Sequence, residues 1–389
     1  MLNRWMFTSF DATPRGLALY RIFYALFVFF FAAPGHDLYS AFARLGELPD
    51  VFFLPPPGPM TLFSGFPPVA FFEGLLLLLN LGLAAVLFGY RTRAASLLVA
   101  ALFLVGYGFS YSLGKINHNL LFVLVPLVMA GSGWGSAWSL DALAGRNAAG
   151  ANAAPRARNW TLTLLALLVG FGMFTAGFSK LIGGWLDPAT HATQGHFFRQ
   201  YFLNGRQDLL APVFLTFESK ATPLFRDLFW KTLDYATLLF EVGFLAAVAH
   251  PRATRLFMAL AVFFHVGTAL MLNIAFIFNL VAYAAFLPWP RMARSVRRRL
   301  LASGAAAVRR ALQSTAWAGP ALCAMTGATF YAAGSPLLLL DRLDVLTSDL
   351  TLREGLALVL AAGLVLALVA AQLRRLLTVR KGEGAPASV

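Results

Sequence analysis

The feature that most constrains this chain is a series of long apolar segments with almost no charge inside them. Residues 97–105 and 356–369 contain no polar residue at all. Only 12% of the 389 residues are charged, whereas a soluble domain carries about 25%. A helix crosses a bilayer with about 20 apolar residues, and a barrel strand would alternate with period two. The pattern therefore predicts an all-α polytopic membrane protein.

The apolar segments predict about ten transmembrane helices with two long outer loops. The expected spans are residues 17–34, 70–89, 94–112, 118–132, 160–178, 229–249, 254–272, 274–289, 316–339 and 355–373. Pro126 is expected to kink or shorten the fourth. The two long outer connections are residues 35–69, rich in Pro and Phe, and residues 179–228, rich in aromatic residues and histidine. Connections of this length usually have a function or a structure of their own.

The distribution of Arg and Lys predicts the orientation. If the N-terminus is cytoplasmic, the inner loops collect about twice as many Arg and Lys as the outer loops, as the positive-inside rule requires. We therefore expect both termini in the cytoplasm and a location in the bacterial inner (cell) membrane. The net charge of +14 reflects these basic clusters, above all the one within residues 291–310. Such clusters meet anionic lipid, and no nucleic-acid-binding pattern accompanies them.

A few ionisable residues lie in or beside the apolar segments, where charge is costly and functional sites are expected. Lys180 ends one expected span and His118 begins another, both at the outer side. Lys180 is either a lysine whose ammonium reaches the interface or a desolvated base. His118 either caps its helix or belongs to a site. These two residues define one candidate site.

Two further groups are buried in expected spans. His265 lies inside the seventh span, either in a structural hydrogen bond or in the site, and Glu241 lies inside the sixth. Glu241 is expected to pair structurally with a cation such as Arg21. No metal site is predicted, because the five-residue spacing of His191 and His196 matches no metal-ligand motif. The single cysteine, Cys323, is expected to be a small buried hydrophobic residue.

Several short motifs, in a fixed order, resemble those of the horizontally transferred transmembrane (HTTM) domain family, to which vitamin K-dependent gamma-glutamyl carboxylase belongs. They cover roughly residues 12–300, and the two most informative are Asn117-His118-Asn119 and Ala176-Gly177-Phe178-Ser179-Lys180-Leu181 followed by Trp185. The others are Leu19-Tyr20-Arg21-Ile22-Phe23, Phe88-Gly89-Tyr90-Arg91, Trp138-Ser139-Leu140-Asp141, Phe263-Phe264-His265 and Pro288-Trp289-Pro290-Arg291.

The resemblance implies a domain organisation and a chemistry. Residues 1–300 would form the HTTM, gamma-carboxylase-like transmembrane domain, and residues 301–389 a basic linker and a transmembrane hairpin in place of the carboxylase's large soluble domain. The family's base lysine falls at Lys180. It would deprotonate a vitamin K hydroquinone-like reduced quinone, and the oxygenated quinone would support carbon dioxide addition to a carbanion. The family also has a second lysine where this chain has Ser179.

We therefore expect a carboxylase-like enzyme, a lyase or quinol-using oxidoreductase, with an outward-facing membrane pocket. Its cofactors would be a reduced quinone, and carbon dioxide and oxygen if carboxylase chemistry is retained. Its partners would be membrane lipid and the lipid-soluble quinone, with a protein substrate left open. Lys180 and His118 are the expected catalytic residues; Asn117, His265, Trp185 and Arg21 are the expected substrate-binding residues. The alternative is a non-catalytic membrane protein that binds lipid or a partner.

Overall fold

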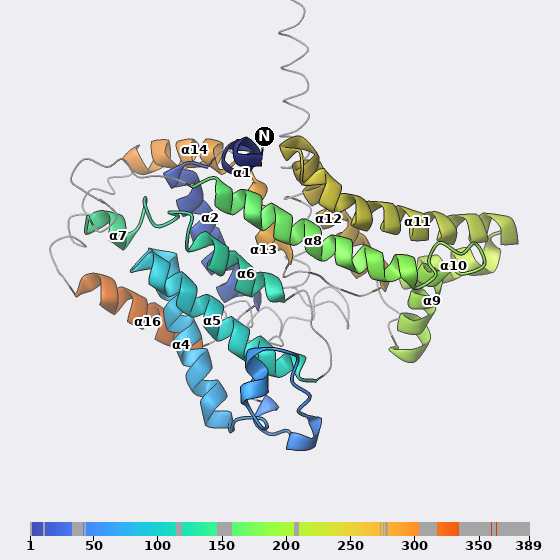
Figure 1. Ribbon diagram of the computed structural model, residues 1–389, viewed down its shortest axis with the longest axis horizontal. Helices are drawn as coiled ribbons and strands as arrows, with labels where there is room; N and C mark the ends of the chain where they lie inside the picture. Colours follow the sequence, from blue (N-terminus) through green and yellow to red (C-terminus); the bar gives the residue numbers. More distant parts are fainter. Residues whose placement is uncertain are drawn as a thin grey trace, which may run out of the picture. The chain divides into compact units, whose positions relative to one another are not determined.

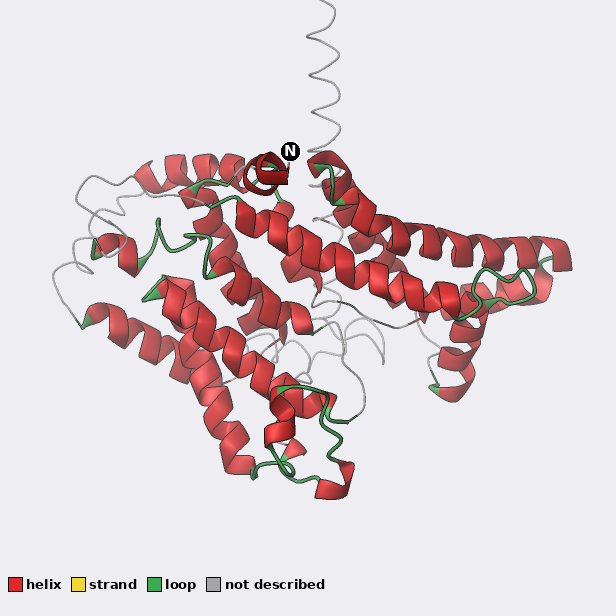
Figure 2. Cartoon of the chain, in the orientation of Figure 1, coloured by secondary structure: helices red, strands yellow, loops and turns green. Residues whose placement is uncertain are grey.

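The structure is a computed structural model of the chain, and all its regular elements within the described residues are helical (Figure 2). The described residues are 2–10, 12–32, 42, 44–113, 119–145, 158–205, 210–272, 274, 276, 279–302, 317–333, 359 and 363. The predicted all-α class is therefore confirmed for this part of the chain.

The chain divides into two compact units. Unit 1 comprises Met1–Leu165, Pro288–Val345 and Thr351–Arg353, and unit 2 comprises Ala166–Leu287, Leu346–Leu350 and Glu354–Val389. The expected boundary near residue 300 stays a prediction, because most residues after 302 lie outside the described part.

Unit 1 contains the N-terminal helices and two later ones (Figure 1). Its elements are α1 (Leu2–Thr8), α2 (Pro14–Phe27) continued by the π-helical turn η1 (Val28–Ala32), the 3-10 turns η2 (Asp50–Phe52) and η3 (Pro59–Leu62), α4 (Val69–Phe88), α5 (Thr92–Tyr111), α6 (Leu120–Met129), α7 (Leu140–Leu143), the start of α8 (Trp160–Ile182), α14 (Trp289–Ala302) and α16 (Ala318–Ala333).

The start of α2 and the end of α4 follow from local sequence. Thr13 caps α2, because its hydroxyl accepts a hydrogen bond from the Gly16 amide, and Pro14 supplies the preformed first turn. Helix α4 ends where Gly89 adopts the left-handed conformation, with φ of 66°. Helix α16 packs on α4 at Gly327, where an added Cβ would lie 2.8 Å from the Leu81 Cα.

Unit 2 contains the rest of α8 and the helices that follow it. They are α9 (Ala192–Phe198) with the π-helical turn η4 (Arg199–Leu203), α10 (Ala211–Lys220), α11 (Pro223–Ala247), α12 (Pro251–Leu272), α13 (Leu280–Tyr283) and the 3-10 turn η6 (Ala284–Phe286). The long connection over 179–228 thus has a structure of its own, because most of its described residues are helical. Phe197, Ala211, Trp230 and Leu272 form a core beneath it.

Within the described residues, five helical segments are long and apolar enough to cross a membrane. They are Pro14–Phe31, Val69–Phe88, Thr92–Tyr111, Trp160–Ile182 and Pro251–Leu272, and they coincide with five of the expected spans. Helix α6 has 10 residues and contains Pro126, in keeping with a shortened segment. These helices support an integral membrane protein. The count of ten spans stays a prediction, and the tenth segment lies almost wholly outside the described residues.

Candidate functional site

The candidate site centres on an ion pair in unit 2 between Lys180 and Glu241. The Lys180 Nζ lies 2.7 Å from Oε1 and 2.5 Å from Oε2 of Glu241. The Lys180 side chain is 25% exposed and that of Glu241 only 5%. The expectation that Glu241 pairs with Arg21 is therefore wrong: Lys180 is the partner. An ammonium between two carboxylate oxygens is the strong, charge-assisted form of hydrogen bond.

A glycine allows the two residues to meet. An added Cβ on Gly177 would lie 2.7 Å from the Glu241 Cβ and 2.9 Å from the Val242 amide nitrogen. The backbone of α8 therefore approaches α11 more closely than a larger residue would allow, as small residues do between membrane helices. Lys180 is three residues beyond Gly177, on the same face of α8, so this close approach brings its ammonium to Glu241.

Pairing changes how Lys180 can act. The ammonium lies in the last turn of α8 and donates hydrogen bonds to both oxygens of the Glu241 carboxylate. Because the two groups are in direct hydrogen-bond contact, a proton can pass from one to the other. Lys180 and Glu241 together form one proton-accepting unit.

An aromatic pair adjoins the ammonium. The Lys180 Nζ lies 5.4 Å from the Trp185 ring centroid, a cation–π contact, and the Trp185 ring lies 5.9 Å from that of His196. Partial burial lowers the pKa of His196, and the charges of Arg199 and Lys180 lower it further, against a smaller opposing effect of Asp234. His196 is therefore neutral at pH 7. The expected substrate-binding residue Trp185 lies beside Lys180.

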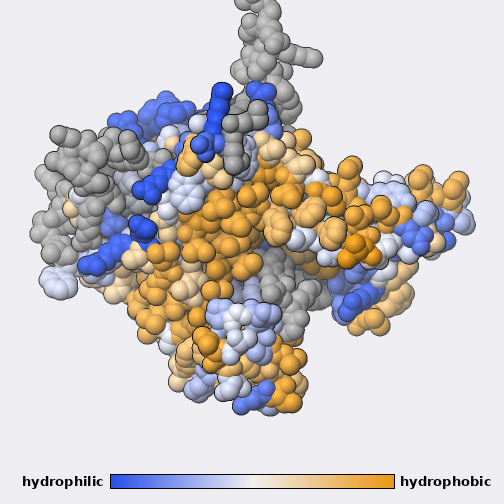
Figure 3. Space-filling view, viewed as in Figure 1, coloured by the Kyte–Doolittle hydropathy of each residue, from blue (hydrophilic) through white to orange (hydrophobic). Residues whose placement is uncertain are grey.

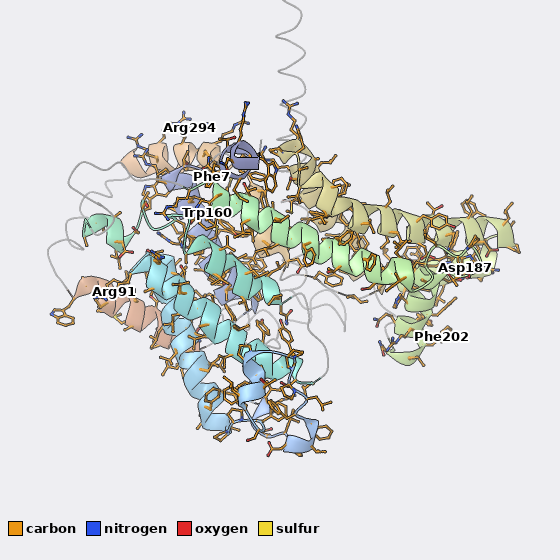
Figure 4. All side chains as sticks on the ribbon, viewed as in Figure 1. Phe7, Arg91, Trp160, Asp187, Phe202 and Arg294 are labelled. Carbon is orange, nitrogen blue, oxygen red and sulfur yellow. The ribbon has the colours of Figure 1, made fainter. Side chains whose placement is uncertain are left out.

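The segment that carries Trp185 is fixed by two buried charges of α11. The Lys231 ammonium donates hydrogen bonds to the backbone carbonyls of Trp185, at 2.9 Å, and Thr190, at 2.6 Å. The Asp234 carboxylate accepts from the amides of Ala192 and Thr193 at the start of α9. These contacts bracket the loop after α8, where Figure 4 labels Asp187.

The sequence interpretation missed these two charges, although a signal was present. Lys231, Asp234 and Glu241 are separated by three and seven residues, a spacing that places them on one face of a helix. Charges that share one face of an otherwise apolar helix indicate that this face borders a polar region inside the protein.

His265 belongs to a buried polar cluster, which its interpretation as a structural hydrogen-bonding residue anticipated. Its Nε2 lies 2.8 Å from the Tyr283 hydroxyl and 3.1 Å from the Asn279 Nδ2, and its ring lies 4.6 Å from that of Phe276. Tyr283 is also within electrostatic range of Glu241. The contacts hold the imidazole in place, and its role toward a substrate stays a prediction.

The side chain of Arg21, in unit 1, binds backbone carbonyl groups. Its fully buried guanidinium donates to the carbonyls of Trp134, at 3.0 Å, and Trp138, at 2.5 Å. The two motifs at 88–91 and 138–141 meet nearby, because the Asp141 carboxylate accepts from the Arg91 and Thr92 amides and so caps α5. These contacts of Arg21 are structural. Its binding to a substrate stays a prediction.

Two expected site residues, Asn117 and His118, lie outside the described residues, so the expected proximity of His118 to Lys180 stays a prediction. Of the six expected site residues, the structure thus brings together Lys180 and Trp185. It adds Glu241, His196 and Lys231 to them. Comparisons with protein-family models, with curated proteins and with solved structures give no match to this chain.

Proposed function

We propose that this protein is an HTTM-family enzyme of about ten spans that binds a reduced quinone beside Lys180 and takes a phenolic proton from it. The observation that carries the proposal is the Lys180–Glu241 pair, at 2.5–2.7 Å, at the end of an apolar membrane helix. An ionisable pair in that setting is costly and therefore marks a functional site. The motif resemblance independently assigns Lys180 to proton abstraction.

Lys180 is the proposed base, and Glu241 activates it. Transfer of the ammonium proton to the Glu241 carboxylate leaves a neutral amine, which accepts the phenolic proton; the ammonium formed then stabilises the phenolate. Trp185 offers an aromatic face next to the ammonium, which suits a planar ring. His118 and His265 would orient the substrate or relay the proton, Asn117 would donate a hydrogen bond, and Arg21 is a further proposed substrate-binding residue.

A lipid-soluble substrate suits the surroundings of the pair. The side chains of Phe178, Ile182 and Leu186, at and just after the end of α8, are 48%, 73% and 52% exposed. Apolar side chains exposed at this level favour approach from the bilayer over approach from water. The bound reduced quinone would supply the strong base for carbon dioxide addition, with oxygen as its oxidant, if carboxylase chemistry is retained.

The test is turnover of reduced quinones by the purified chain with oxygen and labelled bicarbonate. Lys180→Ala should abolish turnover, because general acid–base catalysis contributes about 10²–10⁴-fold. Lys180→Arg should abolish it as well, since a guanidinium cannot accept a proton at neutral pH. The arginine variant can still pair with Glu241, so its loss of activity would not arise from loss of the pair. Lys220→Ala, at the exposed end of α10, is the control.

Turnover of Lys180→Arg equal to that of the parent would refute Lys180 as a proton-transfer residue. The second candidate, a non-catalytic protein that binds lipid or a partner through the same exposed apolar side chains, predicts instead no quinol turnover by the parent with any quinone of the panel.

The proposed orientation, with both termini in the cytoplasm of a bacterial cell and Lys180 near the outer side, has its own test. Topology reporters fused after Arg158 and after Leu210 should report the inner and the outer side, respectively. Reporters on the same side would refute the proposed topology while leaving the Lys180–Glu241 site untouched.

A further inference from the structure

Helix α14 of unit 1 is amphipathic and strongly basic. Its sequence, WPRMARSVRRRLLA, contains five arginines and no acidic residue. Trp289 and Ala293 are buried and Val296 is half-buried, whereas Arg291, Arg294 and Arg298 are exposed. At 100° per residue the first three share one face and these arginines lie on the opposite face. Figure 4 labels Arg294 on this outward face.

The buried face of α14 packs against the first turns of a membrane-spanning segment. The Trp289 ring lies 6.0 Å from that of Tyr20 and 5.7 Å from that of Phe23, both in α2. An added Cβ on Gly16 would lie 3.1 Å from the Pro290 nitrogen. Because Gly16 is the third residue of the span Pro14–Phe31, this contact places the start of α14 where that span leaves the hydrocarbon.

Other cations lie close to the same end of the span. Arg15, the second residue of α2, is exposed, and Arg4 in α1 is exposed as well. Figure 3 shows hydrophilic side chains gathered over α14 and α1, and hydrophobic side chains over α4 and α5 of the same unit. Unit 1 thus presents a concentrated positive surface at the membrane boundary.

We infer that α14 lies in the plane of the membrane surface and binds the headgroups of anionic phospholipids through Arg291, Arg294 and Arg298. A basic amphipathic helix buries its apolar face and directs its cations to anionic headgroups. Here the protein itself covers the apolar face, so the cations alone face the lipid. The guanidinium is suited to this role because it meets a phosphate with two parallel donors.

The partner is the anionic lipid of the surrounding leaflet, and its binding to α14 does not depend on the proposed enzymatic activity. Each basic residue near an anionic surface strengthens binding by about fivefold, so two should contribute about twenty-fivefold. The attraction should weaken at high salt, because it is screened beyond about 10 Å at 0.1 M ionic strength.

The experiment measures binding of phosphatidylglycerol with a fluorescent acyl chain to the full chain in detergent micelles, with matched phosphatidylcholine as the second arm. The parent should prefer phosphatidylglycerol, and Arg294→Gln with Arg298→Gln should weaken its binding about twenty-fivefold. Arg294→Lys with Arg298→Lys should keep most of the affinity. The control pair, Arg44→Gln with Lys220→Gln, removes two exposed cations elsewhere and should change affinity less than twofold.

Four results would overturn the inference. One is equal binding of both lipids by the parent, and another is unchanged phosphatidylglycerol binding by the double glutamine variant. A third is displacement of the lipid by an equal concentration of soluble glycerol phosphate, which would indicate a site for free phosphate esters. An equally large loss in the double lysine variant would show that charge does not carry the binding, and would also count against it.

Discussion

Removal of either partner of the Lys180–Glu241 pair should have unequal effects on stability. Lys180→Met leaves a carboxylate that is 5% exposed, whereas Glu241→Gln leaves an ammonium that is 25% exposed and can reach the interface. Breaking a buried pair typically costs 3–5 kcal/mol. We therefore expect a loss of about 3–4 kcal/mol for Lys180→Met and about half of that for Glu241→Gln.

The larger loss can be worked out from proton uptake. An isolated buried carboxylate loses its charge by binding a proton, and the pKa of an ordinary glutamate is about 4.3. Holding that proton at pH 7 costs about 1.36 kcal/mol for each of about 2.7 pH units, or roughly 3.7 kcal/mol. The folded variant then binds one proton more than the unfolded chain, so its stability rises as pH falls. The deficit should shrink by about 2.7 kcal/mol between pH 7 and pH 5.

The assay is unfolding in mixed detergent micelles for the parent, the two single variants and the double variant, at pH 7 and pH 5. The double variant removes both charges and should be more stable at pH 7 than Lys180→Met alone. A coupling energy below about 0.5 kcal/mol would show that the two sites behave as independent. A Lys180→Met deficit that does not change with pH would contradict the proton-uptake reasoning.

Three further predictions concern Gly177, Asp141 and His196. Gly177→Ala should lower the free energy of unfolding by about 1–3 kcal/mol, because its Cβ would contact Glu241. Gly172→Ala, where the Cβ meets nothing within 4 Å, should be neutral or stabilising, and equal effects would refute the close approach. Asp141→Ala should lower the free energy of unfolding by about 2 kcal/mol, because the cap of α5 is lost. An unchanged melting temperature would contradict this prediction. Because the pKa of His196 is lowered in the folded state, the unfolded chain binds more protons just below pH 6.5. The free energy of unfolding of the parent should therefore fall in that range relative to that of His196→Gln. Parallel curves of unfolding free energy against pH from 7.5 to 5.5 would exclude the effect.

Sequence alone determined the class of this protein and the position of its longest helices. Apolar length is a local property, because a bilayer requires each helix to satisfy its own backbone and to present apolar side chains throughout. The segment over residues 70–89 was therefore expected within one residue of α4 at each end. Sequence also marked Lys180, because an ionisable residue near an apolar segment is conspicuous without any knowledge of its neighbours, and it marked Trp185 through the motif that carries the family resemblance.

Only the tertiary structure decided which charges meet. Lys180 and Glu241 are 61 residues apart, and a pairing across that separation depends on how closely α8 approaches α11 at Gly177. Sequence analysis predicted a cation such as Arg21 as the partner of Glu241, but the Arg21 guanidinium donates its hydrogen bonds to the backbone carbonyls of Trp134 and Trp138. Periodicity assigns each side chain to a face of its own helix, whereas the partner is set by packing between helices, which no local pattern contains.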